Sequence, residues 1–191
     1  MADSMNNPAC LCVFAHPDDE AFRCGGTLAL MARAGVRVWV FSFTCGEAGS
    51  CGSPPICTPE ELGSVRREEL RCSCRKLGLE EPIILDYRDG NLAAYPEQAA
   101  VEMLEDVIYR LQPQIMITWP PDGLSGHADH IAASKWAKKA FDSARQGNGD
   151  FLKSLYYLAV PQSVAVALGM DGLHATADSE ISIEVDVNPV R

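Results

Sequence analysis

The sequence predicts an α/β fold, a Rossmann-like three-layer α/β/α sandwich with a mostly parallel sheet. Short apolar segments that suit strands buried on both faces alternate along the chain with segments of helical periodicity. Such alternation favours parallel strands joined by right-handed crossovers, with helices on both faces of the sheet. The 191 residues show no internal repeat and no linker, so we expect a single domain over 1–191.

The first strands and the first helix are marked by composition and by a stop signal. Residues 10–14 form an unbroken apolar run, which is typical of a buried strand. A helical pattern follows over about 21–34, and Gly35 is the residue type that commonly ends a helix. Residues 37–43 predict the second strand, after which a loop rich in Gly, Pro and Ser runs over 44–58.

The second helix carries signals at both of its ends. Thr58 suits the N-cap position and Pro59 the first helical position. Glu61 stands three residues after the cap, where its side chain can complete a capping box. We expect this helix to run to about Leu77 and to be ended by Gly78.

The rest of the chain continues the alternation. Apolar residues recur at helical spacing over 97–111, between two apolar segments that suit the third and fourth strands. The other predicted elements are a strand at 82–87, a strand at 114–119, a helix over about 127–145, and strand-like segments at 154–160 and 180–187.

Charge and hydropathy argue against several classes of partner. The chain has 16 Lys and Arg against 26 Asp and Glu, a net charge of −10, whereas nucleic acids and anionic membranes attract clustered basic residues. No apolar stretch approaches the ~20 residues that span a bilayer. Residues 1–8 are expected to be a flexible tail without the character of a secretory signal. We therefore expect a cytoplasmic protein that binds neither nucleic acid nor membrane.

The eight cysteines are expected to be reduced, because a chain of this size folds without disulfides and a cytoplasmic setting keeps thiols free. Four of them lie in strand-like or helical patterns and are expected to be buried structural thiols: Cys10, Cys12, Cys72 and Cys74. Three others share the loop over 44–58, where one local bridge is sterically feasible: Cys45, Cys51 and Cys57.

Polar residues gather where an open parallel sheet binds its ligands. Ligands of such sheets bind beyond the carboxyl ends of the strands, here the segments 15–20, 44–58, 87–91 and 120–130. Three of the four histidines stand in two of these segments.

The two histidine-bearing segments predict a divalent metal site. His127 and His130 are spaced to project from one face of a helix start, and a turn can bring His16 and Asp19 together. Imidazoles and a carboxylate suit Zn²⁺, which can polarise a water molecule, and Fe²⁺ accepts the same ligands.

A hydrolytic site also needs a carboxylate that takes a proton from the attacking water, and both Asp18 and Glu20 are placed for this role. Taken singly, each motif also suits a solvated histidine or acidic residues that stabilise a helix N-terminus. Two such motifs at the ends of two strands favour a site. His174 has no such companion, so we expect it to be a surface or structural residue. No G-x-G-x-x-G follows the first strand, which argues against a dinucleotide-binding turn.

Six motifs together resemble one known family over about residues 10–145. They are AHPDDE at 15–20, Gly25-Gly26-Thr27, Gly46-Glu47, Arg66 with Glu69-Leu70, Asp89-Gly90, and H-x-D-H at 127–130. The sequence is similar in these motifs to the PIG-L/LmbE-like zinc-dependent de-N-acetylases, which remove acetyl groups from N-acetylglucosamine units of glycoconjugates.

The resemblance implies a role for each residue of the two histidine-bearing motifs. His16, Asp19 and His130 would bind Zn²⁺, with Fe²⁺ as the alternative ion, and Asp18 would be the general base. The other implied roles are His127 as acid or oxyanion stabiliser, Asp129 as the acceptor that orients His127 through its second ring N–H, and Glu20 as a structural carboxylate.

The resemblance also implies substrate contacts. Arg66 and Asp89 match positions that contact the sugar or its substituent, with a surface salt bridge as the alternative interpretation of each. Glu47 lies at the same rim and is included as a weaker candidate.

We therefore expect a zinc-dependent hydrolase that removes the N-acetyl group from a small-molecule glucosamine conjugate, in a homo-oligomer as the resemblance suggests. One alternative is an amidase that cleaves a thiol-sugar conjugate at the same site. Another is a non-catalytic sugar- or metal-binding module, which is suggested because the chain is short after residue 145 relative to the family.

Overall fold

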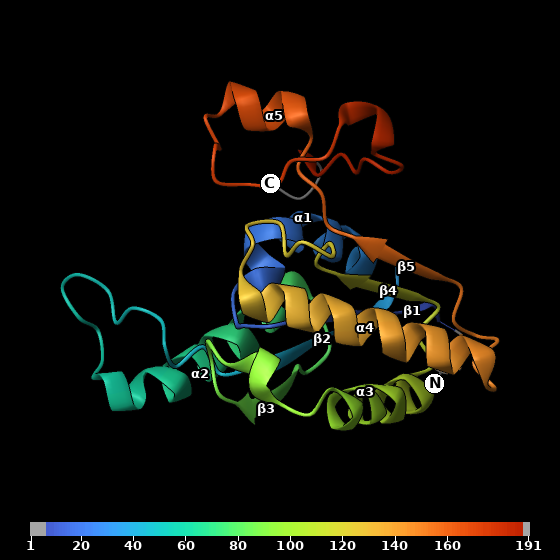
Figure 1. The fold of residues 1–191 in the computed structure, drawn as a ribbon, viewed down its shortest axis with the longest axis horizontal. Helices are drawn as coiled ribbons and strands as arrows, with labels where there is room; N and C mark the ends of the chain where they lie inside the picture. The colour runs from blue at the N-terminus through green and yellow to red at the C-terminus, as the bar shows by residue number, and fades with distance from the viewer. Residues whose placement is uncertain (1–6, 189–191) are drawn as a thin grey trace.

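The structure is a computed structural model and describes residues 7–188. Five parallel strands form the centre of its fold (Figure 1). Their order across the sheet is β3-β2-β1-β4-β5. The strands are β1 (Ala9–Phe14), β2 (Arg37–Thr44), β3 (Ile83–Tyr87), β4 (Ile115–Thr118) and β5 (Ser154–Tyr157). The predicted tail over 1–8 falls, for residues 1–6, outside the described part of the chain.

Helices cover both faces of the sheet, which confirms the predicted α/β/α sandwich (Figure 1). Buried residues of α1 and α2 pack on one face, and those of α3 and α4 pack on the other. The helices are α1 (Asp19–Arg33), α2 (Pro59–Leu77), α3 (Glu97–Leu111), α4 (Ala128–Gln146) and the short α5 (Gln162–Ala167), with 3₁₀ turns at Leu92–Ala94 and Asp178–Glu180.

The central strand β1 explains why both faces must be covered. Each of its side chains is fully buried. Leu11 and Val13 face the layer of α3 and α4, whereas Cys10, Cys12 and Phe14 face the layer of α1 and α2. This is the pattern expected of a strand in the interior of a parallel sheet.

Helix α2 begins and ends as its sequence predicts. The backbone N–H of Thr58 donates to Glu61 Oε2 at 3.0 Å, which completes the capping box. Gly78 ends the helix with φ at 77°, in the left-handed region that glycine adopts without steric cost.

The sheet order also predicts where a ligand binds. The chain moves outward from β1 to β2 on one side and crosses to β4 on the other, so the connections after β1 and β4 leave the sheet in opposite directions. A crevice forms at such a switch point beyond the carboxyl ends of the two strands.

The expectation of a strand at 180–187 is wrong. After the 3₁₀ turn at Asp178–Glu180 this segment is irregular, and Ile183 and Val185 are exposed. An alternating pattern becomes a strand when a sheet edge pairs with it, but here the segment lies over α1, where Val187 contacts Gly26. A Cβ on Gly26 would come within 2.8 Å of the Val187 Cβ, so glycine permits this packing.

The cysteines are free throughout, including Cys51 and Cys57 in the loop where a bridge was feasible. Cys10, Cys12 and Cys74 are buried as expected, but Cys72 is exposed. Because residues two apart on a helix point to nearly opposite sides, burial of Cys74 turns Cys72 outward. No helix within residues 7–188 is long and apolar enough to cross a membrane.

Candidate metal centre and pocket

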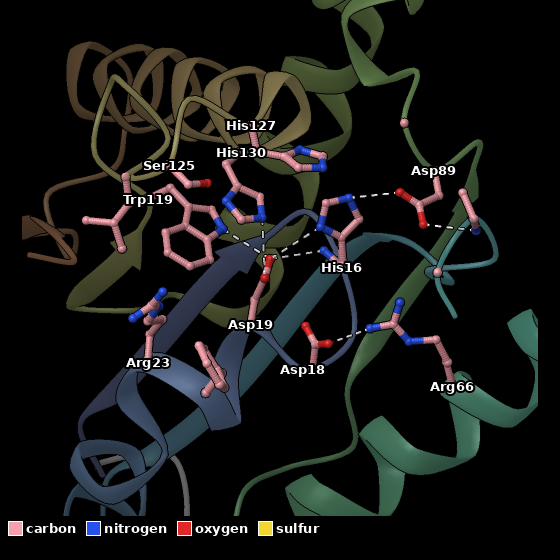
Figure 2. A pocket seen from close by; sticks show the side chains of 15 residues that line it. His16, Asp18, Asp19, Arg23, Arg66, Asp89, Trp119, Ser125, His127 and His130 are labelled. Atoms are coloured by element: carbon pink, nitrogen blue, oxygen red, sulfur yellow. Dashed lines mark hydrogen bonds and ion pairs between the residues drawn. The ribbon is translucent and has the colours of Figure 1, made fainter. Parts of the chain in front are cut away.

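A cavity of about 500 Å³ opens at the carboxyl ends of β1 and β4 (Figure 2). All four segments singled out from the sequence contribute to its wall, for example through His16, Ala48, Asp89 and His127. The volume is typical of a site for a small molecule. The four segments that the sequence singled out therefore surround one cavity, and ligand binding there stays a prediction.

The turn between β1 and α1 places an acidic side chain in the cavity. Asp18 has φ at 95°, a conformation rarely adopted by residues other than glycine. Its backbone N–H donates to Glu20 Oε2, and Glu20 Oε1 accepts from the Ser73 hydroxyl on α2. Glu20 is buried away from the cavity and ties α1 to α2, so it has the structural position that was expected.

Three residues converge as a potential metal-binding group: His16, Asp19 and His130. Their ligand atoms all lie within 4.8 Å of one another. The Asp19 Oδ2 atom accepts hydrogen bonds from the backbone of Ala15 and His16 and from the indole of Trp119. The Asp19 Oδ1 atom faces His130 Nε2 at 3.5 Å, so Oδ1 is the oxygen available to a cation.

The ring of His130 is held in one orientation from two sides. Its Nδ1 lies 3.2 Å from the carbonyl oxygen of Gly123 and donates to it, which leaves the Nε2 lone pair directed toward Asp19. Trp119 stacks on the imidazole with ring centroids 4.1 Å apart and planes 5° apart. A pre-oriented imidazole and a partly unsatisfied carboxylate fit a divalent cation.

His16 is held by two carboxylates on its other side. Its Nε2 atom lies 3.0 Å from Asp89 Oδ1 and 3.2 Å from Asp129 Oδ2. Burial lowers the pKa of His16, but the hydrogen bond to Asp89 and the charges of Asp19 and Asp89 outweigh burial and raise this pKa to about 9. With Nε2 occupied as a donor, Nδ1 is the atom of His16 that suits a metal.

A second group, His16 with His127 and Asp129, also lies within 4.8 Å. It fits a metal less well, because both oxygens of the Asp129 carboxylate already accept backbone hydrogen bonds. The N–H of Gly90 donates to Oδ2 at 2.7 Å and the N–H of Leu92 to Oδ1 at 3.0 Å. Asp129 therefore holds the loop after β3 against α4 and faces His16.

His127 is the N-cap of α4, and its contact with Asp129 differs from the one expected. The Nδ1 atom of His127 accepts the backbone N–H of Asp129 at 3.2 Å, whereas the family resemblance implied that the Asp129 carboxylate accepts a ring N–H of His127. The N-cap geometry explains the difference, because the first helical N–H groups need acceptors. Burial and the charges of His130 and His16 lower the pKa of His127. A neutral ring that accepts at Nδ1 carries its proton on Nε2.

Arg66 lines the cavity, but its guanidinium is hydrogen-bonded to Asp18 and to the backbone. Its Nη2 donates to Asp18 Oδ2 at 2.6 Å and to the Pro17 carbonyl at 2.5 Å, and its Nη1 donates to the Gly46 carbonyl at 3.0 Å. Partial burial raises the pKa of Asp18, and the Arg66 charge opposes that rise. The Asp18 side chain is 69% exposed, so its free oxygen is accessible to a water molecule in the cavity.

Glu47 lies behind the cavity wall rather than in it. Its Oε1 accepts the backbone N–H of Asp89 at 2.8 Å, and Asp89 Oδ2 accepts the N–H of Ala48 at 3.1 Å. These two hydrogen bonds join the loops after β2 and β3. The hydrogen bond and charge of His16 lower the pKa of Asp89, against the effect of burial. Asp89 lines the cavity as expected, whereas Glu47 positions the backbone of Asp89.

Three residues of the cavity wall were missed by sequence reasoning: Phe22, Arg23 and Trp119. Trp119 directly follows β4, which was the available signal for it. His174 lies outside the metal-binding group and near Asp122, 3.5 Å away, as expected of a surface residue. Cys24 is buried on α1 and donates to the Glu20 carbonyl.

Comparison with protein families and curated proteins gives consistent matches. The family model described as PIG-L, GlcNAc-PI de-N-acetylase, matches residues 11–141. A 1D-myo-inositol 2-acetamido-2-deoxy-alpha-D-glucopyranoside deacetylase from Acidothermus cellulolyticus is 34% identical over 190 residues, covering 88% of this chain and 63% of the relative. The chain spans about three fifths of the length of the curated relatives it matches.

Solved structures share the fold. The conserved protein TT1542 from Thermus thermophilus is 32% identical with a TM-score of 0.62, and the match covers 78% of this chain and 64% of that one. The N,N'-diacetylchitobiose deacetylase from Pyrococcus horikoshii has a TM-score of 0.66 at 24% identity, over 90% of this chain and 59% of that chain, which shows a shared fold.

Proposed function

Since this chain belongs to the PIG-L family, whose model is that of GlcNAc-PI de-N-acetylase, we propose that it is a metal-dependent hydrolase that removes the N-acetyl group from a small N-acetylglucosamine conjugate. One observation carries the proposal. His16, Asp19 and His130 converge at the carboxyl ends of β1 and β4, with the accessible carboxylate of Asp18 beside them in the same cavity.

We propose Zn²⁺ as the ion, held by His16, Asp19 and His130, with Fe²⁺ as the alternative. Two imidazoles and one carboxylate are a common ligand set for catalytic zinc. When bound, the ion supplies Lewis acidity, which polarises the acetamide carbonyl and lowers the pKa of a coordinated water. The His130 contact with the Gly123 carbonyl and the Asp19 contact with the Trp119 indole support this assignment, because they orient the ligand atoms.

Asp18 takes a proton from the attacking water in this proposal. A base works best when its pKa is close to the pH of the reaction, and partial burial raises the pKa of Asp18 in that direction. Arg66 binds one carboxylate oxygen at 2.6 Å and so points the other toward the cavity. Asp18 then carries the proton until the carbon–nitrogen bond breaks.

His127 stabilises the oxyanion that develops on the acetamide oxygen. Its Nδ1 is occupied by the N–H of Asp129, so the N–H at Nε2 is left to donate. As the tetrahedral intermediate collapses, the carbon–nitrogen bond breaks and the proton on Asp18 passes to the leaving nitrogen. The products are the free amine and acetic acid, which ionises to acetate by giving its proton to solvent, and Asp18 is restored as a carboxylate.

The proposed substrate is a 2-acetamido-2-deoxyglucoside, the class named for the relative from Acidothermus cellulolyticus. Asp89 is the proposed contact to sugar hydroxyls, because its carboxylate lines the cavity and is held in place by Ala48 and His16. Arg66 acts on the substrate through Asp18. Cytoplasmic location and homo-oligomeric assembly stay predictions.

Acetate and amine release tests this function. Purified protein, stripped with a chelator and reloaded with Zn²⁺ or, without oxygen, with Fe²⁺, is incubated with a panel of N-acetylglucosamine conjugates. We expect equal amounts of acetate and primary amine, dependent on the metal. Amine without acetate from a thiol-sugar conjugate would identify the amidase alternative. Stoichiometric metal binding without any amine would identify a non-catalytic module.

A further inference from the structure

We propose that Phe22 and Arg23 form a subsite for an anionic group on the aglycone of the substrate, so that the preferred conjugates carry a carboxylate or a phosphate. This inference rests on the proposed function and extends it from the sugar to the group attached to it. Both residues lie where the first turn of α1 passes into the second, as its fourth and fifth residues, and line the same cavity as the candidate metal-binding group.

Arg23 is a cation in the cavity wall whose hydrogen-bonding capacity is unused. Its guanidinium lies 4.7 Å from the centroid of the Phe22 ring. Within residues 7–188, no ion pair or hydrogen bond joins its side chain to another residue. A guanidinium has five N–H donors in a planar fork that matches carboxylate and phosphate oxygens.

Arg66 provides the contrast within the same cavity. Its guanidinium donates to Asp18 and to the carbonyls of Pro17 and Gly46, so it is committed to the protein. Figure 2 shows Arg66 and Arg23 on opposite sides of the Asp18 and Asp19 carboxylates. A ligand whose acetamide lies over these carboxylates therefore has Arg23 available on the side away from Arg66.

The charge of the cavity explains why an arginine without an ion-pair partner indicates an anionic ligand. Asp18, Asp19 and Asp89 line this cavity and the whole chain carries a net charge of −10. These carboxylates weaken the binding of an anion, and a basic side chain that is not already paired with them offsets this effect. Arg23 supplies such a charge and is not paired with the carboxylates that are proposed to bind the metal and the proton.

Phe22 gives the subsite its geometry. Its side chain is 75% exposed, although burial of an aromatic ring ordinarily stabilises a fold. The ring lies against one face of the guanidinium in a cation–π contact and offers apolar surface at the cavity. The alternative interpretation is that the two side chains merely shield each other from water, and it predicts no dependence on ligand charge.

Three matched ligands separate these interpretations. They are the carboxymethyl, 2-phosphoethyl and carbamoylmethyl glycosides of N-acetylglucosamine, of which the last is neutral. We expect the wild-type chain to deacetylate at least one anionic glycoside with a kcat/KM about ten-fold or more above that for the neutral one. The carboxylate and phosphate arms show which anion fits.

Variants then assign the preference to the residue. Arg23→Gln should reduce the anionic-to-neutral ratio of kcat/KM to about one, mainly through KM, and Arg23→Lys should retain part of it. Arg33→Gln, in the last turn of the same helix, is the matched control and should keep the full ratio. A ratio near one in the wild-type chain, or a ratio unchanged in Arg23→Gln, would overturn the proposal.

A binding measurement makes the subsite testable without turnover. The deacetylated amine products of the three glycosides are titrated into the zinc-loaded chain, followed by the fluorescence of Trp119 and the other tryptophans. Tighter binding of the anionic products that is lost in Arg23→Gln supports the subsite even if no glycoside is hydrolysed, in which case the proposed function alone fails. Equal binding of all three products rejects the subsite.

Discussion

Asp19 and His130 meet across the switch point of the sheet, with 3.5 Å between Asp19 Oδ1 and His130 Nε2. Asp19 begins the helix that follows β1, and His130 lies in the first turn of the helix that follows β4. Because β1 and β4 are adjacent and parallel, their carboxyl ends bring these two helix starts together. The candidate metal site therefore depends on the register of this strand pair as much as on its proposed ligands.

Replacing His130 tests the metal site directly. We expect His130→Ala to lower zinc affinity by about 100-fold or more, because a site with two remaining protein ligands binds weakly. Metal content after dialysis and a competition titration with a chelator measure the effect. His174→Ala is the matched control, since His174 is half-exposed near Asp122 and outside the ligand group. Equal zinc affinity of both variants would contradict the assignment.

Asp18→Asn tests the proposed role of Asp18 as general base separately from metal binding. Asn tolerates the left-handed conformation at this position, where φ is 95°, so the turn should persist. We expect full zinc content and a kcat lower by about 10²- to 10⁴-fold, the range of general base catalysis. Single-turnover rates with the zinc-loaded variant measure the loss. Turnover close to that of the wild-type chain would reject Asp18 as the base.

Much of this site could be predicted because its residues follow strands in sequence. The apolar segments identify β1 and β4, and the motifs around Asp18 and His127 lie directly after them. The contact of Asp129 with His16 could not be predicted, because it depends on how the loop after β3 reaches α4. Nor could Arg23, since a single basic residue in a helix has no pattern that distinguishes a cavity wall from a solvated face.

In the fold as well, features set by local sequence could be predicted and features set by tertiary contacts could not. Local signals such as the capping box at Thr58 and the apolar run of β1 are complete within a few residues, and both predictions are confirmed. The segment 180–187 has a strand-like alternation, but a strand also needs a partner edge that is remote in sequence. Its contact between Val187 and Gly26 is a tertiary feature that no local pattern reports.

Metal binding should compete with a proton on His16. In the metal-free protein the pKa of His16 is about 9, above the ordinary value of 6.5, so the ring is charged between these pH values. Zinc needs the neutral ring, and we expect release of about one proton near pH 7.5 and an affinity that rises with pH up to about 9. Calorimetric titrations in buffers with different ionisation heats count the protons.

The stability of the metal-free fold should fall with rising pH, whereas the zinc affinity should rise. Because the folded pKa of His16 is raised, its charged form stabilises the metal-free fold fully below pH 6.5, and this contribution is lost as pH rises through about 9. Asp89→Asn removes the hydrogen bond that raises this pKa, so it should reduce both the proton release and the loss of stability. Unaltered proton release in that variant would mean that another group titrates.

Gly46→Ala tests whether Arg66 must be held for Asp18 to act. Gly46 has φ at 67°, and a Cβ there would overlap Nη1 of Arg66, so the methyl group would displace the guanidinium from Asp18. Gly35→Ala is the matched control, with φ at 86° and no atom within 4 Å of its Cβ. Both variants should lose about 1–2 kcal/mol of stability in urea unfolding from the strained backbone.

Only Gly46→Ala should also lose kcat. It should shift the pH dependence of kcat as well, because Asp18 would lose the positive charge that opposes the rise of its pKa. An equal kcat in the two variants at equal stability would show that Arg66 does not position Asp18.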